Sequence, residues 1–378
     1  MVVERPELTD GTVRLRAHTD DDIDAIVEMC RDPEMALWTS VPQPYHRENA
    51  KHFTRELVPH GWETGEWRGW AIEAVDDDGR ARFAGNMDIR GVGVTDIGYA
   101  LHPWARGRGV TTRAIRLATR WAFDHGGAQI VHWRAHVGNV ASRRTAWRTG
   151  FTFHGTVPKL LYERGRAIDT WIASLQPDDD GQPTTRWLMP PVLRGERVVL
   201  RPFRDDDVPR LVEACSDPLT KQWLAGLPLP YTEDDARAWL LGRVEAQSLG
   251  RGVWWCVADP DTDLMLANIG VFGLDSKYDS NGEIGYWAHP DARGRGVVTE
   301  ATRLATEHAL APESEAGLGV RRLQLGAGAD NTASRHIATA CGFTEVGRHR
   351  AVDRLGDGTY TDFVWYDRLA TDDPSLGQ

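Results

Sequence analysis

A short loop of glycine and arginine residues occurs twice in this chain of 378 residues and could bind an anion. Each copy follows a strand-like Ile-Gly-Tyr and a His-Pro, and each precedes a helix-like segment. Backbone N–H groups converge in such a loop, and the dipole of the following helix favours negative charge there. We therefore predict two phosphate-binding loops, formed by Arg106, Gly107, Arg108, Gly109, Val110 and Thr111 and by Arg293, Gly294, Arg295, Gly296, Val297 and Val298.

The two loops belong to a duplication that extends along the whole chain. Landmarks recur in the same order while their offset grows slowly, as short loop insertions produce. Matching pairs include Trp38 and Trp223, Gly98-Tyr99 and Gly285-Tyr286, Asn139 and Asn331, and Gly150-Phe151 and Gly342-Phe343. We predict two domains of roughly 180 residues, a size that can bury a full core. They occupy 1–176 and 191–378, and an aspartate- and proline-rich linker at 177–190 joins them.

The order of strands and helices within each copy is also predictable from periodicity and capping residues. The strands of the first copy are expected near 12–16, 70–75, 83–89, 96–101 and 130–136. Its helices are expected at 19–30, 48–57 and 111–125, and from Asn139 onward. A closing hairpin has its turn at 164–166, and at 356–358 in the second copy. This order predicts an α/β fold, with a mixed sheet and helices on both faces in each domain.

Composition and charge argue against several classes of function. The net charge of −11 argues against nucleic-acid binding and fits a cationic substrate such as an amine, although acidity also serves solubility. No apolar run reaches the roughly 20 residues of a membrane span and no signal-peptide core is present, so we expect a cytoplasmic protein without membrane contact. Cys256 and Cys341 lack metal-ligand spacing, and Cys30 and Cys215 are expected in the core, so we predict neither disulfide nor metal site.

The repeated loop and a second motif resemble the GNAT superfamily of N-acetyltransferases, and within it the ribosomal-protein N-terminal acetyltransferase (RimJ/RimL-like) branch. The three fixed positions of the family's loop, Gln/Arg-x-x-Gly-x-Gly/Ala, are occupied by Arg106, Gly109 and Thr111, and by Arg293, Gly296 and Val298. Both copies depart at the last position, where a small residue is usual. The second motif, Asn-x-x-Ser followed by Gly-Phe, begins at Asn139 and at Asn331. The resemblance covers nearly the whole chain twice.

The resemblance implies acetyl-CoA as the donor of an acyl group. Its diphosphate is then expected on the backbone N–H groups of each loop, with charge-assisted contacts from Arg108 and Arg295. Asn139 and Asn331 are expected to hold the pantetheine amides or to cap the helix that follows them. Nothing in these residues specifies the length of the acyl chain.

Acetyl transfer needs a neutral amine, an oxyanion donor and a proton for the departing thiolate. A lysine ε-amine is only about 0.04% neutral at pH 7, whereas an α-amine is about 10% neutral and needs a weaker base. Glu283 lies where relatives carry a general base on a strand, and Asp96, about 1.5 Å shorter in reach, lies there in the first copy. The oxyanion donor in relatives is a backbone N–H of the same strand. Alternation places Glu283, Gly285 and Trp287 on one face of that strand and Ile284 and Tyr286 on the other.

The proton donor is expected to be a serine. Many relatives carry a tyrosine four residues after the Ser/Ala position, where this chain has Ala146 and Ala338. The resemblance therefore implies that Ser142 and Ser334 protonate the thiolate, as is proposed in the ribosomal-protein branch; each could instead only bond backbone in the first turn of its helix.

Two hypotheses follow for the function. The first is an acetyl-CoA-dependent N-acetyltransferase acting on a primary amine, with the C-terminal domain active and the N-terminal domain active or structural. Its acceptor is a peptide or protein α-amine, or a small-molecule amine. The alternative is a non-catalytic acyl-CoA-binding or regulatory protein. A dinucleotide-dependent dehydrogenase fits poorly because the loops lie in the middle of each domain. The tandem chain is expected as a monomer whose halves imitate a dimer, or as a homodimer.

Overall fold

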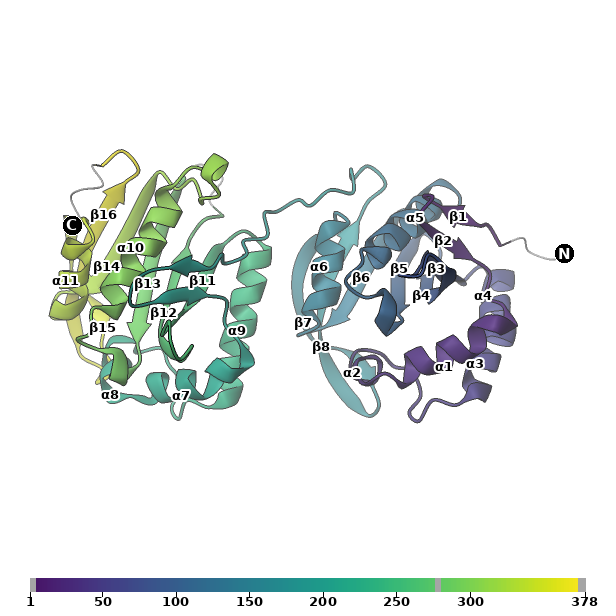
Figure 1. Cartoon of the computed structure of the whole chain (residues 1–378), viewed down its shortest axis with the longest axis horizontal. Coiled ribbons are helices and arrows are strands. Elements are labelled where there is room, and N and C mark those ends of the chain that lie inside the picture. The colour runs from purple at the N-terminus through teal and green to yellow at the C-terminus, as the bar shows by residue number, and fades with distance from the viewer. Residues whose placement is uncertain (1–4, 276–279, 373–378) are drawn as a thin grey trace. The chain divides into compact units, whose positions relative to one another are not determined.

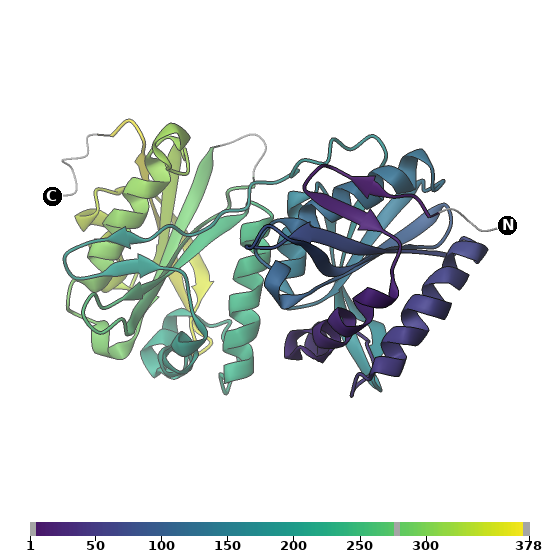
Figure 2. The same cartoon turned by 45° about the vertical axis from the view of Figure 1, so that its right-hand side comes forward.

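The computed structural model describes residues 5–275 and 280–372 and divides into two compact units, Met1–Thr184 and Thr185–Gln378 (Figure 1). Each unit contains one eight-stranded mixed sheet. In the turned view of Figure 2 the helices of each unit lie on both sides of its sheet. The predicted α/β architecture is confirmed.

The N-terminal unit has the strand order β1-β2-β3-β4-β5-β6-β8-β7. Its strands are β1 (Leu8–Thr9), β2 (Val13–Arg16), β3 (Trp67–Val75), β4 (Ala81–Arg90), β5 (Val94–Leu101), β6 (Ile130–His136), β7 (Thr152–Glu163) and β8 (Arg166–Leu175). Its α-helices are α1 (Ile23–Arg31), α2 (Pro33–Trp38), α3 (Arg47–His52), α4 (Val58–Thr64), α5 (Val110–Asp124) and α6 (Val140–Arg148).

The C-terminal unit repeats this arrangement with the order β15-β16-β14-β13-β12-β11-β10-β9. Its strands are β9 (Leu193–Arg194), β10 (Val199–Arg201), β11 (Gly252–Ala258), β12 (Met265–Phe272), β13 (Asn281–Ala288), β14 (Arg322–Gly328), β15 (Thr344–Arg354) and β16 (Tyr360–Leu369). Its α-helices are α7 (Val208–Ser216), α8 (Pro218–Trp223), α9 (Glu233–Ser248), α10 (Val297–Leu310) and α11 (Thr332–Ala340).

The helix expected at 48–57 proves longer. A π-helical segment at Phe53–Leu57 joins α3 to α4, so helical structure extends from 47 to 64. The short helices α2 and α8 and the two-residue edge strands β1 and β9 were not predicted. Elements of two to six residues carry too few side chains to show a period, which explains the omission.

Strands of the C-terminal unit are buried on both faces. Trp255 and Val257 of β11 belong to the core that packs against α10, whereas Cys256 and Ala258 pack against α7. In β13, Ile284 and Tyr286 face α10 and Trp287 faces α7, as strand alternation predicts. The two faces of this strand therefore belong to two separate packed layers.

The parallel pair β13 and β14 is hydrogen-bonded over only part of its length. The ladder has three registered pairs and ends at Glu283 and Gln324, although the strands continue to Ala288 and Gly328. We call the opening beyond this last pair the window. In the N-terminal unit the corresponding ladder continues one pair further, to Ile97 and Trp133.

Both glycine-arginine loops have the backbone that their glycines permit. Gly107 and Gly109 have φ of 74° and 75°, and Gly294 and Gly296 have φ of 70° and 72°. Residues with a Cβ rarely adopt this left-handed conformation. Helices α5 and α10 begin directly after these turns, so the first N–H groups of each helix project from its loop.

Candidate active site

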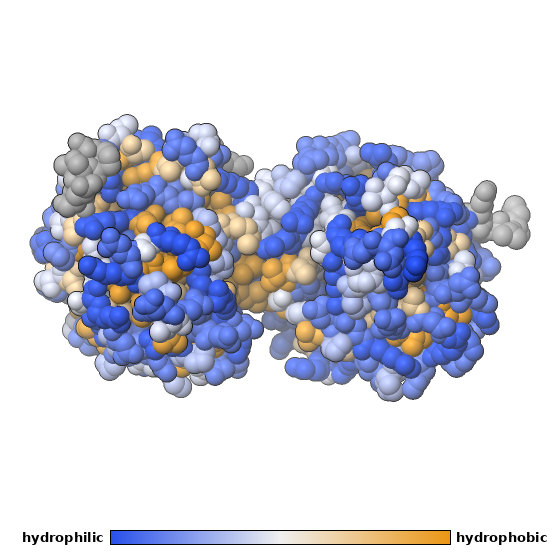
Figure 3. Space-filling view, in the orientation of Figure 1, coloured by the Kyte–Doolittle hydropathy of each residue, from blue (hydrophilic) through white to orange (hydrophobic). Residues whose placement is uncertain are grey.

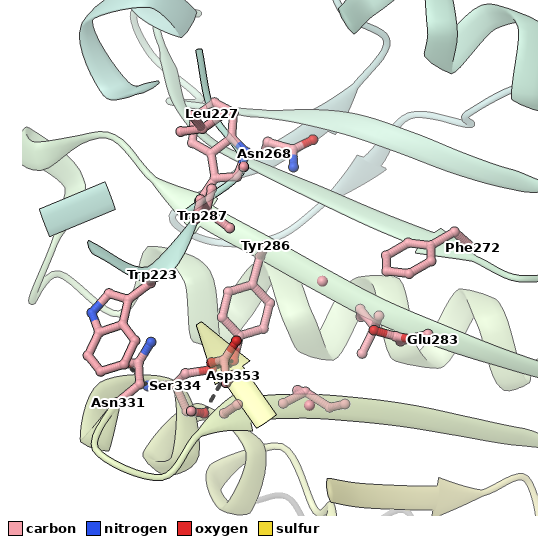
Figure 4. A pocket seen from close by; sticks show the side chains of 18 of the residues that line it. Trp223, Leu227, Asn268, Phe272, Glu283, Tyr286, Trp287, Asn331, Ser334 and Asp353 are labelled. Carbon is pink, nitrogen blue, oxygen red and sulfur yellow. Dashed lines mark hydrogen bonds between the residues drawn. The ribbon is translucent and has the colours of Figure 1, made fainter. Parts of the chain in front are cut away.

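A cavity of about 490 Å³ in the C-terminal unit includes the window (Figure 4). Its lining comes from both layers of the unit. Ile284, Tyr286, Asn331 and Ser334 belong to the α10–α11 side, and Glu283, Gly285, Trp287 and Trp254 to the α7–α9 side. Figure 3 shows hydrophobic residues in the middle of this unit's visible face, bordered by hydrophilic ones. A ligand in the window can therefore contact groups from both faces of the sheet.

Glu283 lies at the last registered pair before the window. It is half-buried and lies opposite Phe272 of β12. No described residue forms a hydrogen bond or ion pair with its carboxylate, and burial raises the pKa of this carboxyl above its ordinary value. A carboxylate without a partner and with a raised pKa is suited to accept a proton from an amine.

Tyr286 and Ser334 form a hydroxyl pair on the other side of the window. The phenol oxygen of Tyr286 lies 3.1 Å from Oγ of Ser334, and Figure 4 shows the ring pointing toward this serine. The side chain of Asn331 caps α11 by accepting the Ser334 N–H at 3.1 Å, which fixes the serine in the first turn. Burial raises the pKa of Tyr286, so its phenol stays protonated at neutral pH.

The role of Tyr286 was missed from the sequence. The expected tyrosine position after the serine holds Ala338, and Tyr286 comes from a strand 48 residues earlier in the chain. The signal was the recurrence of Gly-Tyr in both copies, combined with an alternation that places this tyrosine opposite the face of Glu283.

Three aromatic rings cover glycines on the face of Glu283. The Trp254 ring lies over Gly270 and the Phe272 ring over Gly285, because a Cβ added at either glycine would contact the ring. The Phe363 ring overlaps the place that a Cβ on Gly326 would take. Trp254 and Phe272 are stacked, with centroids 6.2 Å apart. We call Trp254, Phe272 and Phe363 the aromatic floor.

The N-terminal unit has charged side chains where the C-terminal unit has this floor. By strand register, the counterparts of Gly270, Phe272, Glu283 and Gly326 are Asp88, Arg90, Asp96 and Arg134. Arg90 donates to Asp88 at 2.6 Å, and Arg134 donates to Asp96 at 2.7 Å. The predicted base of the first copy is therefore ion-paired, whereas that of the second has no ion-pair partner among the described residues.

The serine of the N-terminal unit is also engaged by its own chain. Tyr99 and Ser142 have hydroxyl oxygens 2.8 Å apart, and Nε1 of Trp133 lies 2.9 Å from the first and 3.2 Å from the second. Asn139 caps α6 in the same way as its counterpart caps α11. The counterpart of Trp133 is Leu325, which has no N–H to donate.

The loop arginines differ in what they contact. Arg106 pairs with Asp32 and Glu34, and Arg293 pairs with Asp217, so these two connect each loop to a helix N-terminus. Arg108 is bound by Asp77 at 3.0 Å. Arg295 is exposed, and its guanidinium makes one 3.4 Å bond to a backbone oxygen of residue 291.

Sequence reasoning missed one further arginine beside the second loop. Arg197 Nη1 lies 2.9 Å from the place of a Cβ on Gly296, so its guanidinium lies beside this loop. Thr12 occupies the matching position in the first copy. The second loop thus has two arginines, Arg197 and Arg295, available to an anion. No repeat signal could have found the first of them, because it lies in only one copy.

No group of three or more His, Cys, Asp or Glu side chains in the described ranges could hold a metal ion. Within 5–275 and 280–372 no helix is long and apolar enough to cross a membrane.

Comparison with known proteins gives the same assignment for both copies. The family model described as "Acetyltransferase (GNAT) domain" matches residues 12–152 and 197–344. Among solved structures, RimJ of Mycobacterium smegmatis in complex with a CoA-disulfide is 18% identical, with a TM-score of 0.43, and the match covers 50% of this chain and 92% of that one.

Two further solved structures are similar. The ribosomal-protein-S5-alanine acetyltransferase of Vibrio fischeri is 15% identical, with a TM-score of 0.42, over 48% of this chain and 98% of that one. A GNAT-family acetyltransferase of Bacillus anthracis is 18% identical, with a TM-score of 0.41, over 48% and 100% of the two chains.

Proposed function

Because the chain belongs to the GNAT acetyltransferase family, we propose that its C-terminal unit transfers an acetyl group from acetyl-CoA to a primary amine. The observation that carries this proposal is the carboxylate of Glu283 beside the window, which has no partner in the part of the chain that the structure describes and lies across the window from the Tyr286–Ser334 pair. The reaction needs a base that takes a proton from the amine and an acid that protonates the departing thiolate, and the window has a candidate for each. We place the reaction in the cytoplasm.

The second loop and the window supply the binding site for acetyl-CoA in this proposal. Backbone N–H groups at the start of α10 bind the diphosphate, with Arg197 and Arg295 adding charge. The pantetheine arm takes the place of the missing ladder between β13 and β14. The thioester of acetyl-CoA then lies in the window, where side chains from both faces of the sheet can reach it.

The chemical step follows from the groups around the window. The amine nitrogen attacks the thioester carbon, so a C–N bond forms and the C–S bond breaks. Glu283 takes a proton from the attacking nitrogen, and the departing sulfur takes a proton from Ser334. Tyr286 returns a proton to Ser334 and takes one from solvent, and the proton on Glu283 passes to solvent, so both hydroxyls and the carboxylate are restored. A backbone N–H of β13 stabilises the oxyanion.

We propose that the N-terminal unit does not catalyse this reaction. Arg134 holds its candidate base, Asp96, in an ion pair at 2.7 Å. The Nε1–H group of Trp133 donates to the hydroxyl oxygens of Tyr99 and Ser142. Freeing both sets of groups requires breaking internal bonds before any substrate can use them. Its loop still has the backbone of an anion site, so acyl-CoA binding without turnover is its expected property.

Calorimetry with acetyl-CoA tests the proposal. We compare the wild type with Gly109→Glu and Gly296→Glu, because a glutamate in either loop opposes the diphosphate by bulk and charge. Gly358→Glu is the control, since this glycine, like Gly109, has positive φ and open space where a Cβ would lie, and it belongs to neither loop. We expect Gly296→Glu to abolish binding to the C-terminal unit while Gly109→Glu and the control preserve it. Absence of binding in the wild type contradicts the proposal.

A further inference from the structure

A second carboxylate that has no partner among the described residues lines the cavity of the C-terminal unit. This carboxylate is that of Asp353 in β15, which lines the cavity. The pairing of β15 with β16 shifts register between His349 and Asp353. Asp353 is half-buried, and no described residue donates a hydrogen bond to its carboxylate or pairs with it. Burial raises the pKa of this carboxyl, as expected for an acid that lacks a compensating cation.

The surroundings of Asp353 are aromatic. A Cβ added at Gly328 would lie 3.0 Å both from Oδ2 of Asp353 and from the Trp223 ring, so this glycine lets the carboxylate and the indole come close together. Phe363 of the aromatic floor lines the same cavity, and Figure 4 shows Asp353 and Trp223 in it. An acid close to an indole in a cavity lined by aromatic rings favours a cation, because the carboxylate and the aromatic rings both attract positive charge.

The N-terminal copy has neither part of this arrangement. Strand register places Leu161 at the position of Asp353 and His136 at that of Gly328. His136 is nearly buried, with Nε2 3.1 Å from Glu163. The second acid and the glycine that gives it room therefore occur together, and only in the copy whose candidate base, Glu283, has no described partner.

We infer that the acceptor of the C-terminal unit carries a second cationic group in addition to the amine that is acetylated. This inference rests on the proposed function, in which Glu283 takes a proton from the reacting nitrogen. Asp353 binds the second cation beside Trp223, and the aromatic floor contacts the carbon skeleton between the two nitrogens. The shared chemistry is that of a diamine, supplied either by a small molecule or by a peptide whose second residue is basic.

Arg243 is the one cation in the described lining of the cavity, and it lies too far from Asp353 to remove the preference for a cationic ligand there. The guanidinium carbon of Arg243 lies 5.1 Å from the Trp239 ring and 4.6 Å from the Trp254 ring, so it lies between two indoles. Trp254 lies over Gly270 on β12, whereas Asp353 is on β15, and three strands (β13, β14 and β16) separate β12 from β15 in the sheet order. If Arg243 instead bound an anionic acceptor, the enzyme would prefer acceptors that carry a carboxylate over those that carry a second amine.

Release of free thiol from acetyl-CoA in the presence of matched amines tests the inference. The first set shares one ring and one reacting amine: para-xylylenediamine, para-methylbenzylamine and para-(aminomethyl)benzoate carry a second cation, no charge and an anion. The second set consists of the peptides Ala-Lys-Ala, Ala-Leu-Ala and Ala-Glu-Ala. Each set is assayed with the wild type, with Asp353→Asn, and with Asp357→Asn, which removes an exposed charge from the same hairpin.

We expect the doubly cationic member of at least one set to have a kcat/KM about tenfold above its neutral analogue, as one partly buried ion pair provides. Asp353→Asn should reduce this ratio to below about threefold while changing the neutral amine little, and Asp357→Asn should leave the ratio unchanged. The set that shows the effect identifies the source as a small diamine or a peptide.

Two results overturn the inference. One is turnover of neutral or anionic amines at least equal to that of the cationic ones, which leaves the proposed function intact. The other is a cationic preference that persists in Asp353→Asn. If no amine releases thiol, calorimetry of para-xylylenediamine with the CoA-bound protein decides: no binding overturns the inference. Failure of acetyl-CoA itself to bind overturns the proposed function instead.

Discussion

The phenol oxygen of Tyr286 lies 3.1 Å from the hydroxyl oxygen of Ser334, and the two side chains approach from different elements, β13 and α11. The same pair in the N-terminal unit, Tyr99 and Ser142, is closer at 2.8 Å but is also bonded to Trp133. The Tyr286–Ser334 pair thus has no described tryptophan bonded to it and can bond a ligand, whereas the Tyr99–Ser142 pair is already bonded to a side chain of its own unit.

Replacing the pair tests its role as proton donor. We expect Ser334→Ala to lower kcat by about 10²-fold, the range of a lost general acid, and Tyr286→Phe to lower it less because the serine remains. Acetyl-CoA affinity should change little, since the N–H groups of the loop are untouched. Tyr99→Phe is the matched control and should leave kcat unchanged. A normal kcat in Ser334→Ala would show that the thiolate leaves unassisted.

The pH dependence of kcat/KM tests Glu283. The base acts when deprotonated, and burial raises its pKa above the ordinary value. Activity should therefore rise with pH through this raised pKa, and rise again as the amine itself loses its proton. Glu283→Gln should lower kcat/KM by about 10²–10⁴-fold and remove the lower of the two limbs. The counterpart change Asp96→Asn should alter neither the rate nor the profile.

Gly326 tests whether the aromatic floor shapes the acceptor site. A methyl group at this position overlaps the Phe363 ring, so Gly326→Ala must displace that ring. We expect kcat/KM for the amine to fall by about tenfold while the dissociation constant of acetyl-CoA stays within about twofold. Gly347→Ala, at a glycine with open space around it, is the control. Equal losses in both variants would point to a general effect on stability.

The buried pair of Arg16 and Asp22 predicts acid sensitivity of the N-terminal unit. Burial acts to raise the pKa of Asp22, but hydrogen bonds from Arg16 at 2.8 Å and from the Thr19 backbone outweigh it, and the folded pKa is lowered. Its contribution to stability is therefore complete above the unfolded pKa, about 3.9, and is lost as pH falls through the folded value.

Thermal unfolding between pH 6 and pH 2 checks this prediction. Asp22→Asn should lower the unfolding free energy by about 3 kcal/mol at neutral pH and flatten its dependence on pH in the acid range. Asp20→Asn, which breaks an exposed pair with Arg55, should change the unfolding free energy far less, because solvent screens that pair. An equal effect of the two variants would contradict the assignment to the buried pair.

The sequence predicted what depends on local pattern and repetition. The glycine loops, the caps at Asn139 and Asn331, and the strand that carries Glu283 depend on spacing within a few residues, so they could be located. The side-chain partners that distinguish the two copies could not be predicted from the sequence. Arg134 lies beside Asp96 only because the parallel register of β5 and β6 brings them together, and Asp353 reaches the cavity through a register shift in β15. Pairings between distant strands carry no short-range signal.

The window has a consequence for the protein's handling in the cell. Beyond Glu283 and Gln324, two strands in the middle of a sheet stop pairing with each other, which leaves backbone donors and acceptors of the kind found at a sheet edge. In the proposed function, the pantetheine chain of acetyl-CoA bonds to them and completes the sheet, so the coenzyme acts as a structural element while it is bound. Resistance to unfolding and aggregation then depends on the supply of coenzyme A, through the mass-action gain that any ligand of the folded state confers.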